Sequence, residues 1–396
     1  MKSVLGTLLL GTALIAATPA LAKDVKIGIL FGFTGPIESL APPMADAVEL
    51  AMKEVSDSGL LLGGDKVIPV RADSTCTDAS AATAAAERLV TVDKVAAIVG
   101  ADCSGVTAAV VNNVGVPNKL LMISPSATSP AIASAANKGV FYRTAPSDAR
   151  QGELLSQVLI SRGIKKVAVT YTNNDYGKGF SEAFNAAYKA AGGTVTLTAP
   201  HDDGKADYSA EVSALSVAGG DALVVLGYAD QGGNGIIRAS LDSGAFSQFA
   251  VGDGMHSEKL LKDFGPGLKI FGTVPWTTGE GAEKFAALAK AAGKRSDSSF
   301  ERESYDAAAL IMLAMQKAGD PAKAREHIME VANGPGEKIY PGELAKGLKI
   351  LKDGGSIEYV GGSDVHMIGN GESAGSYREF ENKGGKFVTV RMFTGK

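Results

Sequence analysis

VAAIVG (residues 95–100) and KLLMIS (residues 119–124) are the two short apolar runs that decide the fold of this chain. Each run is followed by small and hydroxyl-bearing residues, ADCSG after the first and PSATSP after the second. Short continuous apolar runs with helical sequence between them are typical of buried parallel strands in an α/β sheet. We therefore expect an open parallel sheet in which both strands end at polar loops.

The same strand–helix alternation extends through the first half of the chain. Further strands are expected at 25–31 and 67–72, and helices at 43–56, 79–92 and 104–114. These spacings suit right-handed βαβ units. After the loop sequence RTAPSDA, Asp148 is expected to cap a helix at 149–161.

The alternation then restarts, which predicts a second α/β domain. The expected strands are 166–171, 195–199, 222–227 and 249–252, and the expected helices are 179–191, 208–217 and 235–241. Four more helices are expected at 282–292, 302–318, 321–332 and 341–350. The stretch 357–393 alternates like antiparallel strands, with turn signals in GNGES and ENKGGK.

Ligands of open α/β sheets bind beyond the carboxyl ends of the strands. Ser104, Ser126 and Thr128 are expected at that edge in the first half of the chain. Free N–H groups at helix starts bind carboxylates without a cationic side chain, so these loops suit a small polar ligand. Each of the three residues is equally well explained as a helix cap.

Three residues of the second half are also expected at strand ends. Tyr176 is predicted in a loop within NNDYGKG, Tyr228 follows the strand in VVLGYADQ, and Asp253 follows the strand in FAVGDGM. A tyrosine offers an apolar face together with a hydroxyl group. An aspartate in a partly desolvated crevice is a natural partner for an ammonium group. A plain loop role is about as probable for each residue taken singly.

The sequence gives little support for catalysis. No G-x-G-x-x-G follows the first strand, no G-x-S-x-G is present, and YGKG lacks the rest of a phosphate loop. The four histidines, at 201, 256, 327 and 366, have no metal-ligand spacing. We therefore predict a non-enzyme that needs no cofactor and no metal.

Bulk properties narrow the class of protein further. The chain has 396 residues, which favours two domains. Its charged residues are dispersed along the sequence and its net charge is −4, so neither nucleic acid nor an anionic membrane is indicated as a partner. MKSVLGTLLLGTALIAATPALA at the start is the pattern of a signal peptide cleaved after Ala22. Lys23 follows that site, so no lipid anchor is expected. No later apolar run reaches the roughly 18–20 residues of a membrane span.

The two cysteines, Cys76 and Cys103, each follow a predicted strand. In an exported protein a single pair most simply forms one disulfide. A catalytic or metal-binding pair is the alternative, but it would need a nearby histidine or a C-x-x-C spacing, and the sequence has neither.

Taken in order, these motifs resemble the Leu/Ile/Val-type substrate-binding proteins of ABC transporters, which have the type I periplasmic binding fold. The resemblance covers nearly the whole chain after residue 22. The sequences that carry it are VKIGILFGFTGP, DSTCTDASAA, VGADCSG, LLMISPSATSP, YRTAPSDARQG, TNNDYGKGF, GDGM and SYDAAALIMLAMQKAG. It implies two parallel-sheet lobes, joined by three crossover segments, with a ligand cleft between them.

The resemblance also implies roles for individual residues. Ser104, beside Gly105, would bind a ligand carboxylate, and the loop of Ser126, Ala127 and Thr128 would bind its ammonium group. Asp253 would complete the ammonium site, where branched-chain members carry glutamate. The closing tyrosines would be Tyr176 and Tyr228, and the disulfide would join Cys76 to Cys103.

The implied organisation is a signal peptide at 1–22, one lobe at 23–146 and 277–357, and the other at 147–276 and 358–396. The resemblance implies a monomeric protein in the periplasm. Its implied partners are a small ligand, namely an amino acid, and the permease of an ABC transporter. Leu40 stands where many members carry an aromatic residue, and Asp253 is shorter than glutamate; both differences disfavour a branched aliphatic ligand. Binding of aromatic acids or amides, a role in signalling as a sensor, and an exported enzyme stay as alternatives.

Overall fold

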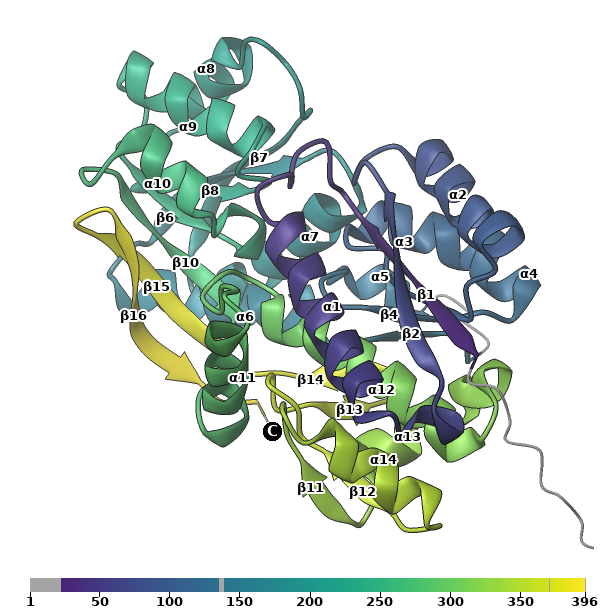
Figure 1. The fold of residues 1–396 in the computed structure, drawn as a ribbon. Helices are drawn as coiled ribbons and strands as arrows, with labels where there is room; N and C mark the ends of the chain where they lie inside the picture. Colours follow the sequence, from purple (N-terminus) through teal and green to yellow (C-terminus); the bar gives the residue numbers. More distant parts are fainter. Residues whose placement is uncertain (1–22, 135–138, 370, 396) are drawn as a thin grey trace, which may run out of the picture.

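The computed structural model describes residues 23–134, 139–369 and 371–395 of the chain (Figure 1). The predicted signal peptide at 1–22 lies outside the described residues. No helix among the described residues is both long and apolar enough to cross a membrane. Two separate sheets, each covered by helices, form the framework of the molecule.

The first sheet has five parallel strands in the order β2-β1-β3-β4-β5. Its strands are β1 (Asp24–Phe31), β2 (Lys66–Asp73), β3 (Ala97–Gly100), β4 (Leu121–Ser124) and β5 (Phe141–Arg143). The helical segments between them are α1 (Ala41–Ser58), η1 (Leu61–Gly63), α2 (Ala79–Arg88), η2 (Leu89–Asp93), α3 (Ser104–Val110), η3 (Val111–Gly115), α4 (Val116–Asn118) and α5 (Pro130–Ser134). Every residue of β3 and β4 is buried, which explains their unbroken apolar sequences.

The second sheet has the order β16-β15-β10-β9-β8-β6-β7 and is parallel except at one side. The parallel strands are β6 (Lys166–Thr172), β7 (Thr194–His201), β8 (Ala222–Leu226), β9 (Gln248–Val251) and β10 (Lys269–Pro275). An antiparallel hairpin, β15 (Tyr377–Lys383) and β16 (Lys386–Phe393), extends the sheet beside β10. The helical segments are α6 (Asp148–Ser161), α7 (Asp175–Ala190), α8 (Ser209–Ala218), α9 (Gly232–Ser243), η4 (Asp253–Met255) and α10 (Glu258–Phe264).

The remaining elements lie between β10 and the final hairpin. They are α11 (Glu280–Ala291), α12 (Glu301–Ala318), η5 (Pro321–Glu326), α13 (Ile328–Asn333), β11 (Glu337–Ile339), α14 (Leu344–Lys352), β12 (Ile357–Tyr359), β13 (His366–Ile368) and β14 (Glu372–Ala374). Helix α12 packs against α1, α14, β3 and β4, on the side of the first sheet. The chain therefore moves between the two sheets three times: after β5, after β10 and before β15.

The two parallel sheets and most of the predicted elements are confirmed. The differences concern the ends of elements and several elements that were not predicted, among them helices α5 and α10. Strands β5, β10 and β11 were not predicted. The segment predicted as one helix at 321–332 consists of the 3-10 helix η5 followed by α13. Within 357–393, β12 pairs in parallel with β11, whereas β13–β14 and β15–β16 form antiparallel pairs as expected.

Two corrections concern helix starts near the predicted site. The cap of α6 is Ser147, whose side chain accepts a hydrogen bond from the N–H of Ala149, so Asp148 lies inside the helix. Helix α7 starts at Asp175, capped by Asn174, so Tyr176 lies on its first turn rather than in a loop. Asparagine is a strong cap, and the glycines of YGKG obscured this start.

Candidate ligand-binding site

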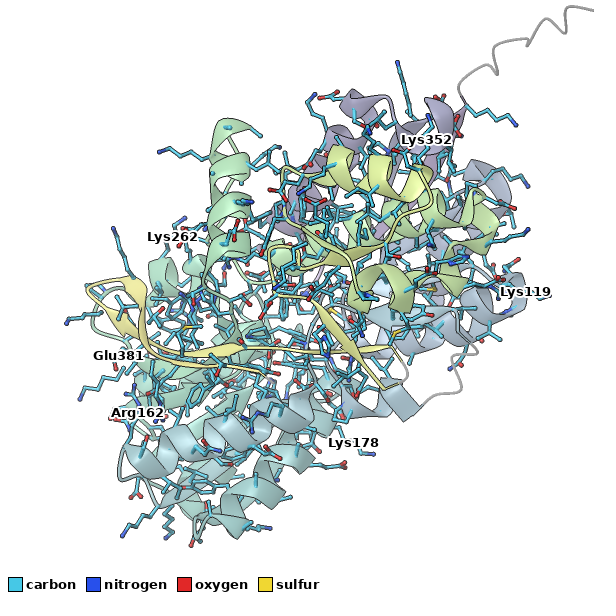
Figure 2. All side chains as sticks on the ribbon, turned by 90° about the horizontal axis from the view of Figure 1, so that it is seen from below. Lys119, Arg162, Lys178, Lys262, Lys352 and Glu381 are labelled. Atoms are coloured by element: carbon cyan, nitrogen blue, oxygen red, sulfur yellow. A yellow bond between two sulfur atoms is a disulfide. The ribbon has the colours of Figure 1, made fainter. Side chains whose placement is uncertain are left out.

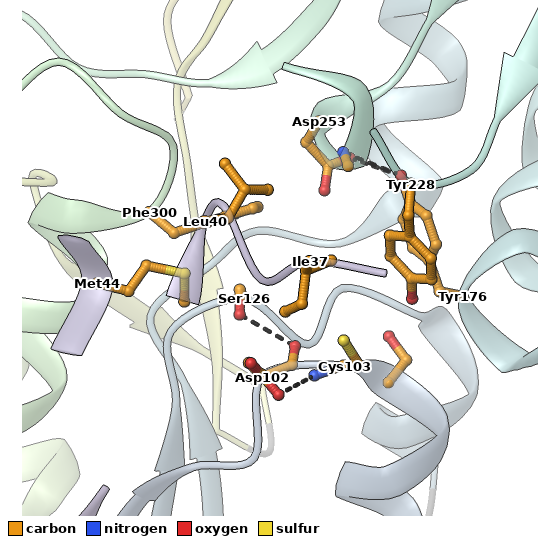
Figure 3. Close-up of a pocket in the computed structure, with 12 residues that line it drawn as sticks. Ile37, Leu40, Met44, Asp102, Cys103, Ser126, Tyr176, Tyr228, Asp253 and Phe300 are labelled. Carbon is orange, nitrogen blue, oxygen red and sulfur yellow. Dashed lines mark hydrogen bonds between the residues drawn. The ribbon is translucent and has the colours of Figure 1, made fainter. Parts of the chain in front are cut away.

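A small cavity of about 30 Å³ lies where the loops of the two sheets face each other (Figure 3). Its lining residues are Ile37, Leu40, Met44, Asp102, Cys103, Ser104, Ser126, Tyr176, Tyr228, Asp253, Gly254 and Phe300. Figure 3 shows Asp102, Cys103 and Ser126 on one side, and Tyr176, Tyr228 and Asp253 on the other. The first group follows strands of the first sheet, and the second group follows strands of the second.

Asp102 fixes the loops of the first sheet in position. Its Oδ2 accepts a 2.6 Å hydrogen bond from the N–H of Gly32, and its Oδ1 accepts bonds from the Ser74 hydroxyl at 2.9 Å and the Cys103 N–H at 3.0 Å. These donors follow β1, β2 and β3, so one carboxylate ties three strand ends together. Burial raises the pKa of Asp102 to about 6, against the effect of these donors.

The Cys76–Cys103 disulfide strengthens the same region. It joins the loop after β2 to the loop after β3, and the two Cα atoms are 5.1 Å apart. The predicted pairing is therefore confirmed. Cys103 precedes Ser104, the first residue of α3, so the bridge anchors the start of this helix.

The loop at 125–129 is held by buried and partly buried hydrogen bonds. The hydroxyl of Ser126 donates to the carbonyl of Asp102 at 3.0 Å, and the Oγ of Ser104 accepts from the N–H of Ser129 at 3.1 Å. The buried Arg143 donates from Nη1 to the carbonyls of Ala127 and Ser129, and it forms an ion pair with Glu372. These hydrogen bonds therefore fix the conformation of the loop.

The opposite side of the cavity carries two stacked tyrosines and a carboxylate. The rings of Tyr176 and Tyr228 are 5.2 Å apart with an angle of 20° between their planes. The Tyr176 hydroxyl donates to Asp253 Oδ1 at 3.2 Å and accepts from the N–H of Gly254 at 3.3 Å. Asp253 begins the short helix η4 directly after β9, and only 3% of its surface is exposed.

Asp253 is buried without an ion pair among the described residues. Burial raises its pKa to about 6, although hydrogen bonds from Gln151 and Tyr176 favour the charged form. The fully buried Asp148 is close enough for its carboxylate to repel that of Asp253, and burial together with this repulsion raises the pKa of Asp148 well above its usual range. The side of the cavity formed by the second sheet is therefore electronegative.

Four apolar side chains complete the lining. Ile37, Leu40 and Met44 come from the segment between β1 and the first turn of α1, and Phe300 directly precedes α12. All four are nearly fully buried. They form an apolar wall beside the polar groups, the combination typical of small-molecule sites.

Five of the predicted site residues line the cavity together: Ser104, Ser126, Tyr176, Tyr228 and Asp253. Gly105, Ala127 and Thr128 do not line it. Gly105, on α3, faces Asp175 at the start of α7. Ala127 and Thr128 are fully buried in their loop. Whether any of these residues contacts a ligand stays a prediction.

Sequence reasoning did not place Ile37, Met44, Asp102, Gly254 or Phe300 at the site. The apolar residues among them carry no local motif: Ile37 and Met44 lie near the start of α1, and Phe300 comes from a distant part of the chain. Asp102 gave a usable signal, because it directly precedes Cys103 at a strand end.

The chemistry of this cavity suits non-covalent binding of a small zwitterion. The carboxylate of Asp253 lies on one side. On the other side, the hydroxyl groups of Ser104 and Ser126 lie beside the carboxyl group of Asp102, which already accepts three hydrogen bonds from the strand-end loops. In the described part of the chain, no group of three or more His, Cys, Asp and Glu side chains is arranged to hold a metal ion.

Comparison with known proteins gives consistent matches. Residues 24–337 match the model of a family described as periplasmic binding protein. Among curated proteins, the chain is 29% identical to a Leu/Ile/Val-binding protein homolog 3 of Brucella melitensis, over 78% of this chain and 85% of that one. It is 31% identical to a Leu/Ile/Val-binding protein homolog 1 of the same organism, over 74% and 77% of the two chains.

Solved structures show the same fold. A leucine-binding protein of Thermotoga maritima superposes with a TM-score of 0.79 at 23% identity, covering 93% of this chain and 99% of that one. A solute-binding protein from R. palustris in complex with 4-hydroxybenzoate superposes with a TM-score of 0.74 at 19% identity, covering 94% and 97%. The predicted two-lobed architecture is therefore confirmed.

Proposed function

Because the chain belongs to the periplasmic binding protein family, we propose that it is the solute-binding component of an ABC importer for a small amino-acid-like ligand. In this proposal the ligand binds in the cavity between the two sheets, and the loaded protein then docks on a membrane permease. The curated relatives support this class of function through their names, which refer to Leu/Ile/Val binding.

The observation that carries the proposal is the buried carboxylate of Asp253. It lies at the cavity with Tyr176 as a hydrogen-bond donor and without a cationic side chain paired to it in the described residues. A desolvated carboxylate is unfavourable unless a positive charge offsets it. The ammonium group of a ligand would supply this charge and form a charge-assisted hydrogen bond.

The opposite side suits the rest of an α-amino acid. We assign Ser104, together with the backbone N–H groups at the start of α3, to the ligand carboxylate. We assign Ser126 to the ammonium group. Thr128 is not in the cavity lining, and its carbonyl accepts a 3.0 Å hydrogen bond from the N–H of Asp148. The wall formed by Ile37, Leu40, Met44 and Phe300 would contact the ligand side chain.

Binding requires the two sheets to move apart and close again. A cavity of about 30 Å³ has room for about two water molecules, so an amino acid enters only if the loops separate. We propose hinge motion of lobes comprising 23–146 with 277–357, and 147–276 with 358–396. The ligand would stabilise the closed form, which is the form that the permease would recognise. We further propose a monomer that acts in the periplasm without catalysing a reaction.

A second candidate ligand class is small aromatic acids. The solved R. palustris protein with 4-hydroxybenzoate has the same fold, and the apolar wall would suit an aromatic ring. The buried carboxylate of Asp253 argues against it, because a ligand with a carboxylate and no amine would be repelled there.

A thermal-shift screen of unfolded and refolded protein tests the proposal, because refolding removes any co-purified ligand. The panel contains α-amino acids, amides, small diamines and aromatic acids. A ligand at about 100 times its Kd adds about 2.7 kcal/mol to the free energy of unfolding, which gives a clear rise in Tm. We expect α-amino acids to give this rise. A response confined to acids without an amine would remove Asp253 from the ammonium site, and turnover of any ligand would contradict the binding role.

A further inference from the structure

A second cavity, of about 550 Å³, lies beside the first, and Leu40 lines both. One wall of the second cavity includes Ser39 and Leu40 with residues from the segment 295–298, and the facing wall includes residues from the segments 256–262 and 385–387. The volume lies within the range of sites that bind small organic molecules. The loop that carries Asp253 continues directly into this wall, so the two cavities are neighbours, and Leu40 is the residue that their linings share.

The second cavity has an excess of positive charge. Five cationic side chains and two carboxylates line it: Lys259, Lys262, Arg295, Arg378 and Lys386, with Glu258 and Asp297. Arg295 pairs with both carboxylates at 3.0 Å, and Lys259 pairs with Asp263 at 2.9 Å. Within the described ranges, Lys262, Arg378 and Lys386 form no ion pair.

Arg378 is the most constrained of these cations, because only 7% of its surface is exposed. Its Nη1 donates to the Thr389 hydroxyl at 3.3 Å, its Nη2 lies 2.8 Å from His256 Nε2, and its Nε has no hydrogen-bond partner among the described residues. Burial and the nearby Arg302 lower the pKa of Arg378 to about 10. A buried guanidinium without a carboxylate is costly, and an anion would offset that cost.

The groups around Arg378 leave its charge uncompensated. Burial and the charge of Arg378 lower the pKa of His256 well below its usual range, so this imidazole is neutral and acts as an acceptor. Trp276 contacts two guanidinium groups: Arg378 Cζ is 3.5 Å and Arg302 Cζ is 4.1 Å from the ring centroid. Arg302 has Glu301 and Glu303 nearby. Among the residues that the structure describes, the one carboxylate that acts on Arg378 is Asp297, which is already paired with Arg295.

We propose that this cavity is a second binding site, which takes a small oxyanion, a carboxylate or a phosphate, through Arg378, Lys262 and Lys386. Arg378 would form the fixed base of the site, because its position is set by Trp276 and His256. Lys262 and Lys386 are exposed and would close over the anion from two segments of the chain; Figure 2 shows Lys262 at the periphery of the molecule. The neighbouring cavity carries the opposite charge, so the two sites select different groups.

Anion binding would also affect closure of the first cavity. The Oγ atoms of Ser39 and Ser257 are 3.0 Å apart, and Arg295 pairs with Glu258, so the two walls already contact each other. An anion between the walls would favour the same closed arrangement. Binding at the two sites would then be coupled in both directions.

Trp276 makes the proposal directly testable, since it is the single tryptophan of the chain and lies in the lining of this cavity. Phosphate and, separately, succinate are titrated into the mature protein while tryptophan fluorescence is recorded. Potassium chloride at matched ionic strength is the control for general screening. We expect a saturable change with at least one of the two anions, and the better of them identifies the preferred chemistry.

Three variants assign the response to residues. Lys262→Ala/Lys386→Ala is expected to weaken anion binding at least about tenfold, the size of one lost charge-assisted bond. Lys383→Ala, the cross-strand neighbour of Lys386 outside the lining, is the matched control and should bind as the wild type does. In the absence of an amino acid, Asp253→Asn should also bind the anion normally, because Asp253 lines the other cavity. Normal anion binding in this variant would support the anion site even if the amino-acid proposal failed.

Several outcomes would overturn the proposal. One is the absence of any saturable change up to about 10 mM of either anion, which would exclude Kd values in the millimolar range. Others are an equal response to potassium chloride, unchanged affinity in the double lysine variant, and loss of anion binding in Asp253→Asn.

Discussion

The hydroxyl of Tyr176 donates a 3.2 Å hydrogen bond to Oδ1 of Asp253, and both side chains are almost fully buried. Tyr176 is on the first turn of α7 and Asp253 follows β9, so this hydrogen bond joins two strand-end segments of the second sheet at the cavity. A tyrosine hydroxyl stabilises a carboxylate only in part, because it is neutral. The arrangement therefore leaves a negative charge available for a cationic ligand group.

Asp253→Asn is predicted to weaken binding of an α-amino acid by about 2–3 kcal/mol, since it removes the charge opposite the ammonium group but preserves shape. Titration calorimetry on the ligand found by the thermal-shift screen measures the effect. Tyr176→Phe is the matched control: it keeps the ring stack with Tyr228 and the charge of Asp253. It removes only the hydroxyl that bonds to Asp253 and Gly254, so we expect a smaller loss of affinity, about 1 kcal/mol. Equal affinity in wild type and Asp253→Asn would exclude Asp253 from the site.

The extent to which the sequence predicted this site depends on the type of signal. Strands β3 and β4 were predictable because both are buried along their whole length and are therefore apolar except for Ser124 at the end of β4. Strand β5 was missed because it has three residues and ends in Arg143, whose charge is compensated by Glu372 from a distant part of the chain. Phe300 lies at the cavity because of tertiary packing, which no local sequence pattern predicts.

Ligand affinity is predicted to fall as the pH decreases through about 6. Burial raises the pKa of Asp253 from 3.8 to about 6, so acidification protonates the carboxylate that the ammonium group needs. The same raised pKa means that the folded protein binds this proton more tightly than the unfolded chain does. The contribution of Asp253 to the free energy of unfolding therefore decreases as the pH rises from about 4 to about 6.

Titration calorimetry between about pH 5 and pH 7.5 measures the first effect, and urea unfolding of the ligand-free protein measures the second. Asp253→Asn should show a flatter dependence in both. Identical pH profiles for the variant and the wild type would show that another group controls the titration.

Loss of the Cys76–Cys103 disulfide is predicted to lower the free energy of unfolding by about 3–4 kcal/mol. The two cysteines are 27 residues apart, and the chain-entropy model gives this value for a loop of that length. Urea unfolding of the wild type and of Cys76→Ala/Cys103→Ala measures it. Thiol labelling of the wild type under native and denaturing conditions should find no free thiol, and two reactive thiols would contradict the bridge.

Two glycines near the site are predicted to respond oppositely to alanine. A Cβ on Gly177 would lie 2.2 Å from the carbonyl oxygen of Thr172, so Gly177→Ala forces the first turn of α7 to move. We expect a loss of about 1–3 kcal/mol in the free energy of unfolding, together with weaker ligand binding, because Tyr176 is the neighbouring residue. Gly105→Ala is the matched control: its nearest new contact, Asp175 Oδ2, is 3.6 Å away.

Since Gly105 lies inside α3, alanine there should leave stability unchanged or raise it by up to about 1 kcal/mol. Urea unfolding and ligand titration on both variants measure these effects. If Gly177→Ala unfolded and bound ligand as the wild type does, the close approach of α7 to β6 would not position Tyr176. The aromatic side of the cavity would then depend on the contacts of Tyr228 and Gly254 instead.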